Sequence, residues 1–228
     1  MKYKPTSKEE LQKLVDDLSI NLGDIDTSKI TDMSYLFCYT SRTDFSGIEN
    51  WDVSKVEDMQ DMFFGAKAFN QPIGDWDVSR VKNMVAMFAF AESFNQDISK
   101  WDVSNVWDMG SMFEKTTSFN ADISKWDVGN VKYMNGMFYQ AKAFNQPIGD
   151  WNVGKVWSMV SMFQGATSFN ADISGWDVSN VKYMRDMFKN AESFNQDLSD
   201  WNVSKVESID EATEDLICNN HNNIRTMQ

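Results

Sequence analysis

Residues 51–75 read WDVSKVEDMQDMFFGAKAFNQPIGD, and this stretch decides the fold because it recurs with a period of 25 residues. A tryptophan column marks the repeats and consists of Trp51, Trp76, Trp101, Trp126, Trp151, Trp176 and Trp201. Between successive tryptophans the same apolar positions return without insertion or deletion. A fixed period of roughly 20 to 50 residues is typical of a solenoid, in which each repeat forms one turn and buries its apolar face against its neighbours.

The first half of each repeat has helix-like spacing. From Val56 to Ala66 the apolar residues lie three, three, one and three positions apart, and Ser54 with Glu57 resembles a capping box in front of them. This pattern predicts a short helix from about Ser54 to Gly65, and its equivalent in every turn.

The residues around each tryptophan alternate instead. Trp76 and Val78 are separated and flanked by Asp75, Asp77 and Ser79, which is the period of a strand with one buried face. The sequence therefore predicts one short strand per turn, stacked in parallel on the next, with the tryptophan column in the core.

An asparagine recurs after the second phenylalanine of each repeat. The asparagine column consists of Asn70, Asn95, Asn120, Asn145, Asn170 and Asn195. Because an amide both donates and accepts, we expect these side chains to satisfy backbone groups of their own and the adjacent turn.

The two ends of the array depart from the repeat. Ser7 and Glu10 form a capping box before an apolar stripe of Leu11, Leu14, Val15 and Leu18, which predicts an N-terminal cap helix. Residues 25–50 form an atypical first repeat that is one residue longer than the others and carries isoleucine in place of tryptophan.

The pattern decays again after Trp201. A helical stripe with an acidic outer face predicts a C-terminal cap helix, and it consists of Val206, Ile209, Ala212, Leu216 and Ile217. Residues 219–228 are polar and are expected to form a frayed tail.

Composition narrows the functional classes. The net charge of -13 argues against a nucleic-acid partner, which needs a basic footprint, and no apolar run is long enough to insert into a membrane. Cys38 and Cys218 lie near opposite ends of the array, too far apart for a disulfide, and neither belongs to a zinc motif. His221, the single histidine, lies in the polar tail, and repeated carboxylates do not form one asymmetric catalytic constellation, so we predict no enzyme activity and no cofactor.

The repeat F-N-x-D-I-S-x-W-D-V-S-x-V-x-x-M-x-x-M-F-x-x-A, which covers residues 25–206, resembles the tandem repeats of BspA-like leucine-rich-repeat (LRR) surface proteins, including repeats of unknown function from mycoplasmas. The resemblance implies an LRR-like curved solenoid that binds a partner or attaches to a surface. It brings no catalytic residues. It also implies a secreted or cell-surface protein, whereas residues 1–10, MKYKPTSKEE, lack the apolar stretch of a signal peptide, which leaves the localisation open.

The expected fold is thus an α/β repeat solenoid, an LRR-like right-handed coil with one short parallel strand and one short helix per turn. It forms a single domain over residues 1–228. Residues 1–24 are the N-terminal cap helix and lead-in, residues 25–200 hold seven repeats, and residues 201–228 hold a partial repeat, the C-terminal cap helix and the tail.

Two surface columns are the main candidate sites. An aromatic–basic column lies one residue past the second valine of each repeat and consists of Glu57, Lys82, Trp107, Lys132, Trp157, Lys182 and Glu207, with Tyr133 and Tyr183 adjacent to it. Stacked lysines and tryptophans would form a cation–π rail able to bind a sugar or a protein, although mutual packing without a ligand explains them as well.

The second column is acidic and lies beside the tryptophans. It includes Asp52, Asp77, Asp102 and Asp127, with Asn152 and Asn202 in two of the later turns. These carboxylates can bond to nearby backbone N–H groups and serine hydroxyls, which we favour, or they can form a weak candidate strip for divalent cations. A third column, Asp97, Asp122, Asp172 and Asp197, is interrupted by prolines and is expected to be a solvated bend.

The sequence therefore predicts a monomeric, non-catalytic adhesion or binding module whose extended face holds a protein or glycan partner. The competing hypothesis is an intracellular acidic scaffold or inhibitor that binds a basic protein, because the chain is strongly acidic.

Overall fold

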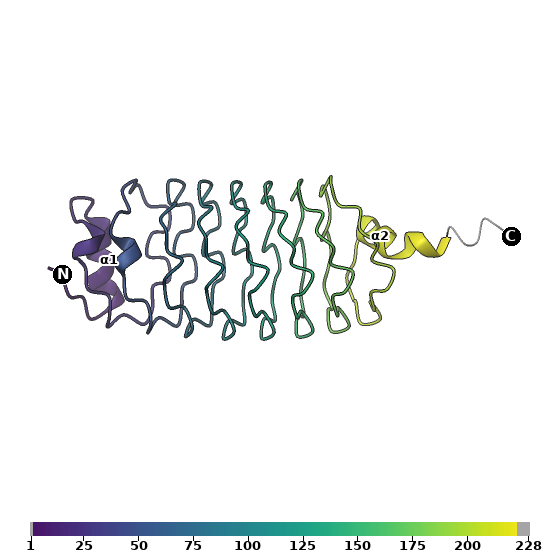
Figure 1. Cartoon of the computed structure of the whole chain (residues 1–228), viewed down its shortest axis with the longest axis horizontal. Helices are drawn as coiled ribbons and strands as arrows, with labels where there is room; N and C mark the ends of the chain where they lie inside the picture. The colour runs from purple at the N-terminus through teal and green to yellow at the C-terminus, as the bar shows by residue number, and fades with distance from the viewer. Residues whose placement is uncertain (1, 223–228) are drawn as a thin grey trace.

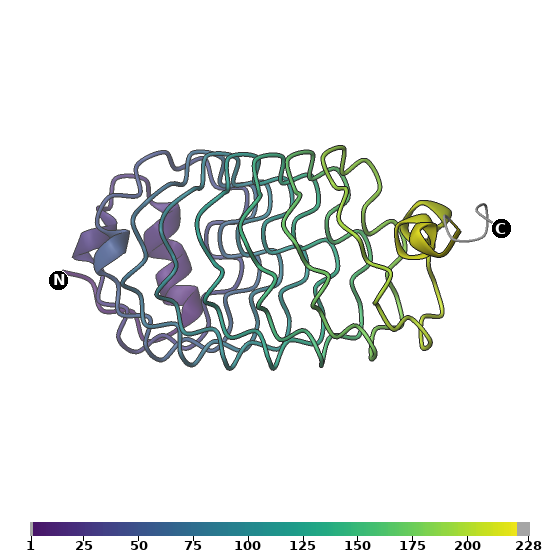
Figure 2. The same ribbon diagram turned by 45° about the vertical axis from the view of Figure 1, so that its right-hand side comes forward.

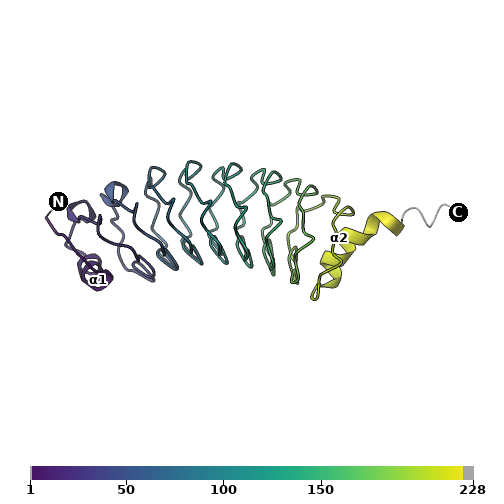
Figure 3. The same cartoon turned by 90° about the horizontal axis from the view of Figure 1, so that it is seen from below.

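The chain folds into a row of stacked coils, one for each repeat, with a helix at each end (Figure 1). The computed structural model describes residues 2–222, with side chains to residue 217. Helix α1 (Lys8–Asp16) and the 3₁₀ helices η1 (Leu22–Asp24) and η2 (Ile48–Asn50) precede the regular coils, and α2 (Glu211–Asn222) follows them. The row is slightly bowed when it is seen from below (Figure 3).

The predicted α/β architecture is wrong. The regular coils of residues 51–210 contain neither a helix nor an extended strand, and successive coils are joined by single parallel bridges between equivalent residues. The bridged residues are Asp32, Asp58, Asn83, Asp108, Tyr133, Ser158, Tyr183 and Ser208. The first pair is 26 residues apart and the others 25, so the predicted extra residue of the first repeat is confirmed.

A series of tight turns replaces the predicted helix. Within one coil the N–H groups of Met62, Phe64 and Ala66 donate to the carbonyl three residues earlier, at 3.2, 3.1 and 3.0 Å. The residues between them donate to the next coil, as Asp61 does to the carbonyl of Val85 at 2.8 Å. This alternation gives almost every backbone group of the segment a partner, which a buried segment requires.

Left-handed residues prevent this segment from becoming a helix. Asp61 has a φ of 52° and Gly65 a φ of 69°, and the equivalent residues of the next five coils also have positive φ. An α-helix cannot contain such residues without breaking. The spacing of Met59, Met62 and Ala66 therefore reflects the inward positions of successive turns. These positions recur every three or four residues, which is also the spacing on one face of a helix.

The predicted strand is also absent. Trp76 and Val78 do alternate inward with exposed Asp77, but turns close on both sides of them, because Trp76 N–H donates to Ile73 and Val81 N–H to Val78. The local backbone hydrogen bonds thus stay within the coil instead of forming a ladder.

Aromatic stacking fills the core. The ring centroid of Phe63 lies 3.7 Å from that of Phe69 and 5.6 Å from that of Phe88, and the rings are nearly parallel in both pairs. All seven side chains of the tryptophan column are at most 5% exposed, which confirms that they belong to the core. Burying rings of this size in register stabilises the contact between coils, beside the backbone hydrogen bonds.

The asparagine column also forms as predicted. Asn95 N–H donates to Oδ1 of Asn70 at 3.0 Å, and the same bond repeats up to Asn195, where the acceptor is Asn170. The amide oxygens from Asn70 to Asn170 therefore each satisfy a backbone donor at the bend of the following coil.

Both end caps are present, with shifted boundaries. Ser7 accepts a hydrogen bond from Glu10 N–H, and α1 buries Leu11 and Val15, but the helix ends at Asp16 and leaves Leu18 56% exposed. Figure 2 shows α1 lying beside the first coils. Arg42 was not predicted to have a structural role. Its buried guanidinium donates hydrogen bonds to the carbonyls of Val15 and Asp17, which connects α1 to the first coil.

The C-terminal helix starts later than the stripe predicts. Val206 and Ile209 precede α2, while Thr213 and Ile217 are the side chains with which it covers the last coil. The helix continues to Asn222, so the start of the predicted polar tail is helical, and residues 223–228 lie outside the described residues, as do the side chains of Cys218 and His221. Cys38 is a free, partly buried thiol.

Candidate binding surface

The aromatic–basic column is a continuous line of residues, one from each coil. Lys132 N–H donates to the carbonyl of Trp107 at 2.9 Å, Trp157 N–H to that of Lys132 at 2.8 Å, and Lys182 N–H to that of Trp157 at 2.9 Å. These bonds fix the register of the column, so the side chains project from one edge of the coils at a regular spacing.

Trp107 and Trp157 are the exposed tryptophans of the described chain, at 43% and 39%. Tyr133 stands edge-on between them, with centroid distances of 6.1 Å to Trp107 and 5.9 Å to Trp157. Tyr183 packs edge-on against Trp157 at 5.3 Å. The two indoles are thus held in place by tyrosines and still present open surface.

The cation–π rail is less regular than the alternation of lysine and tryptophan suggests. Lys182 lies over the Trp157 ring, with its Nζ 5.8 Å from the centroid. Tyrosines, not lysines, make the other ring contacts of Trp107 and Trp157 in the described chain.

The outer lysines of the column are neutralised. Lys82 pairs with Glu57 at 2.7 Å, and Lys182 pairs with Glu207 at 2.9 Å. The hydrogen bond from each lysine, reinforced by its charge, lowers the pKa of its glutamate partner. All four groups are solvent-exposed or nearly so, so these pairs contribute little to stability, and their effect is to remove free positive charge from the two ends of the column.

A shallow hollow of about 470 Å³ opens beside Trp157. The residues that line it are Lys132, Tyr133, Gly154, Lys155, Trp157 and Asn180. Lys155 and Asn180 were not predicted, because they belong to a different position of the repeat, four residues past the tryptophan. The signal that could have indicated the hollow is Gly154, which stands where most coils have serine.

The acidic column lies in turns that its own carboxylates stabilise. Asp52 Oδ1 accepts from Ser54 N–H at 3.0 Å and from the Ser54 hydroxyl at 2.6 Å, and Asp102 Oδ1 accepts from Ser104 N–H at 3.0 Å. These hydrogen bonds lower the pKa of Asp102, with the serine hydroxyl as the larger cause. Asp77 and Asp127 make the same bond to the residue two positions later. No group of three or more histidine, cysteine, aspartate or glutamate side chains in the described residues is arranged to hold a metal ion.

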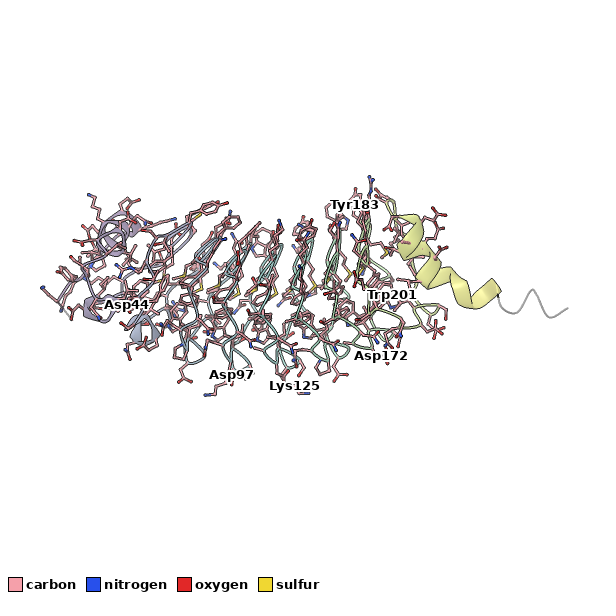
Figure 4. The ribbon with its side chains drawn as sticks, turned by 90° about the horizontal axis from the view of Figure 1, so that it is seen from above. Asp44, Asp97, Lys125, Asp172, Tyr183 and Trp201 are labelled. Carbon is pink, nitrogen blue, oxygen red and sulfur yellow. The ribbon has the colours of Figure 1, made fainter. Side chains whose placement is uncertain are left out.

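The third column also consists of turn aspartates. Asp97 and Asp172 accept from the N–H of the serine two residues later, which lowers their pKa through the serine hydroxyl and backbone N–H. Figure 4 shows Asp97, Lys125 and Asp172 on the edge of the stack opposite Tyr183. The acidic bend and the aromatic–basic column therefore face different sides.

A second aromatic strip, which the sequence analysis missed, crosses the first five coils at the last of the tight turns. Tyr39, which is 74% exposed, packs edge-on against Phe64 at 5.0 Å, and Phe64 lies 5.2 Å from Phe90. Lys115 then lies over the rings of Phe90 and Tyr139. Because these residues are divided between two adjacent repeat positions, no single column of the repeat reveals the strip.

Stacked coils with a repeating core and a variable surface define a tandem-repeat protein, and the comparisons agree with this class. A family model described as "Mycoplasma protein of unknown function, DUF285" matches residues 9–125 and, a second time, residues 112–226. The chain belongs to this family. No curated protein matches the sequence. No solved structure matches it either. Within the described residues, no helix is long and apolar enough to span a bilayer.

Proposed function

We propose that the protein is a non-catalytic binding module, of the adhesive kind implied by its resemblance to BspA-like surface proteins, and that it holds a protein or glycan partner on the aromatic–basic column. One observation carries the proposal. Trp107 and Trp157 are the large aromatic side chains that the structure both exposes and fixes in place on a single column. Rigid aromatic residues supply contact area with little loss of entropy, which is why they dominate binding surfaces.

The repeat architecture supports the same function. Each coil satisfies its own core and backbone, so outward side chains can vary without disturbing the stack. The column uses this freedom, because it changes from glutamate to lysine to tryptophan along the array while the inward residues stay nearly constant.

The double substitution Trp107→Ala and Trp157→Ala tests the proposal. It should weaken binding of a genuine partner by about 2 kcal/mol or more, which is the size of a binding hot spot, and leave the melting temperature nearly unchanged. Partners would be collected on immobilised wild-type protein from host surface extract and from cytosol, and their affinities measured by biolayer interferometry. Tyr39→Ala, an exposed aromatic of the second strip, is the matched control. Equal affinity of the wild-type protein and the double variant for every partner would refute the proposal.

An acidic scaffold for a basic protein is the second candidate, and the net charge of -13 favours it. Polylysine is a suitable probe, because binding through net charge should be strong at low salt and vanish near 0.5 M, where the Debye length falls to about 4 Å. Binding of this kind would be unaffected by the double tryptophan substitution, so the same variant separates the two functions.

A further inference from the structure

The hollow beside Trp157 combines an aromatic platform with two lysines, Lys132 and Lys155, that have no acidic partner among the described side chains. We infer that it binds an acidic sugar, with the ring packed on the Trp157 indole and the carboxylate or sulfate group held between the ammonium groups of Lys132 and Lys155. This inference rests on the proposed function and names the ligand class for the same column.

The hollow carries positive charge that no described acidic side chain neutralises. Lys82 and Lys182 each pair with a glutamate, but Lys132, midway between them, forms no ion pair within the described chain. Lys155 donates to the neutral amide oxygen of Asn130 at 2.7 Å. Two exposed ammonium groups therefore line one hollow of a chain whose net charge is -13, and they attract an anionic ligand group.

The adjacent acidic column is interrupted in the coil that carries Trp157. The coil that contributes Gly154, Lys155 and Trp157 carries Asn152 where five of the seven tryptophan-column coils carry aspartate. The amide keeps the turn, because Asn152 Oδ1 accepts from Gly154 N–H at 3.2 Å. The turn is thus preserved while a carboxylate that would repel an anion is removed from this coil.

The Trp157 indole provides a rigid apolar platform. Trp157 is contacted edge-on by Tyr133 and Tyr183 and carries Lys182 over its ring, yet remains 39% exposed. A pyranose ring has an apolar face of C–H groups that can be removed from water against such an indole. Because its neighbours already fix the indole, little side-chain entropy is lost on binding.

The backbone argues for a sugar over an acidic peptide. An extended peptide commonly binds by adding a strand to an open edge, which needs free N–H and C=O groups. Along this column those groups pair between coils, from Lys132 to Trp107, from Trp157 to Lys132 and from Lys182 to Trp157. Recognition must therefore use side chains, and a hollow of about 470 Å³ lies within the range of small-ligand sites.

Calorimetric titration of the full chain with four probes tests the inference. The probes are trigalacturonate, a sulfated chondroitin disaccharide, neutral lactose and a hexaglutamate peptide. We expect the two acidic saccharides to bind, lactose to bind far more weakly, and the acidic affinity to fall as salt is raised. Lys132→Gln and Lys155→Gln should each weaken the acidic saccharides about tenfold, the effect of losing one hydrogen bond to a charged group. Lys55→Gln is the matched control, because Lys55 holds the Lys155 position in a distant coil and donates to the carbonyl of Ser28.

Three outcomes of these titrations would contradict the inference. Equal binding of lactose, unaffected by the lysine substitutions, would refute the acidic ligand class and leave the proposed function standing. Tighter binding of hexaglutamate with the same lysine dependence would replace the sugar by an acidic peptide. If no probe binds, the inference fails, while the proposed function is judged by the double tryptophan variant and its own partners. Comparison of trigalacturonate with the sulfated disaccharide identifies which acid group is held.

Discussion

The indole Nε1 of Trp126 donates a hydrogen bond to the carbonyl oxygen of Ile98, which lies 28 residues earlier and 3.0 Å away. The tryptophan before it makes the same bond to Ile73, and the one after it to Ile123. Each tryptophan therefore fills the core of its own coil and satisfies a buried carbonyl of the previous coil, so one side chain links the two.

Trp126→Ala should destabilise the fold by about 3 to 5 kcal/mol, because it leaves a cavity in the middle of the array. It also removes one of the two hydrogen bonds that the Ile98 carbonyl accepts, while the bond from Trp101 N–H at 3.2 Å remains. Reversible denaturation with urea measures this loss. Trp126→Phe is the matched control, since it keeps most of the apolar volume and loses the hydrogen bond, and it should cost less than the alanine variant. A loss below about 1 kcal/mol for Trp126→Ala would show that the column contributes little to the core.

Gly136→Ala distinguishes the observed turns from the helix that the spacing predicts. Gly136 has a φ of 62°, and an added Cβ would lie 3.1 Å from the Ser111 hydroxyl oxygen. The substitution should therefore destabilise the protein by about 1 kcal/mol, whereas in a helix alanine would be more stable than glycine by a similar amount. Gly175→Ala is the control, because its Cβ would meet no atom within 4 Å, and it should be nearly neutral. A gain in stability for Gly136→Ala would contradict the turn structure.

Met59, Met62 and Trp76 show which features of the fold can be predicted from the sequence and which cannot. Their recurrence correctly indicates the period, the buried positions and the stacking of successive coils. It does not determine the backbone conformation, because a series of turns and a helix both bring residues three or four positions apart to one side. The deciding feature is the left-handed backbone at positions such as Ser111 and Ala86, residues whose side chains usually disfavour it. Pairing with the next coil compensates for this cost, and a pattern read within one repeat cannot show that pairing.

The candidate site was predicted in part for a related reason. Trp107, Trp157 and Tyr133 occupy neighbouring positions of the repeat, so alignment of the repeats places them together. Lys155 approaches Trp157 because of the path of the chain in a tight turn, which sequence spacing does not reveal. Side-chain pairing between coils, as between Lys182 and Glu207, likewise depends on rotamers that only the structure gives.

Asp108→Asn should raise the melting temperature at pH 7. Burial raises the pKa of Asp108, although its Oδ1 accepts from Gly110 N–H at 2.9 Å. The pKa of this carboxyl is therefore higher in the folded chain than in the unfolded chain, where it is about 3.9. Ionisation of Asp108 then destabilises the fold at neutral pH. This cost disappears as the pH falls below the folded and the unfolded pKa. Asparagine keeps the acceptor without the charge, as Asn83 does at the same position of the previous coil.

The pH dependence of the Asp108→Asn variant provides its own check. The gain over the wild-type protein should be present at pH 7 and shrink toward pH 3, where the carboxyl is neutral in both folded and unfolded chains. Asp102→Asn is the control with the opposite sign, because the pKa of Asp102 is lowered and its ionised form stabilises the fold above the unfolded pKa. A lower melting temperature for Asp108→Asn at pH 7 would show that its charge is favourable.

Calcium should leave the melting temperature of the wild-type protein unchanged to within about one degree at millimolar concentration, since a ligand stabilises only when it binds the folded state. Calcium needs six to eight oxygen ligands at about 2.3 to 2.6 Å, and the acidic column offers one carboxylate per coil. In each turn one of those oxygens already accepts a backbone hydrogen bond, as Asp77 does from Ser79 N–H at 3.1 Å. Asn152 and Asn202 interrupt the column and make the same bond without a charge, which fits a role of the column in forming turns. Scanning calorimetry with calcium, followed by chelator, measures the effect, with magnesium as the ionic-strength control. A calcium-specific rise of several degrees that the chelator reverses would restore the cation-binding hypothesis for Asp52, Asp77, Asp102 and Asp127.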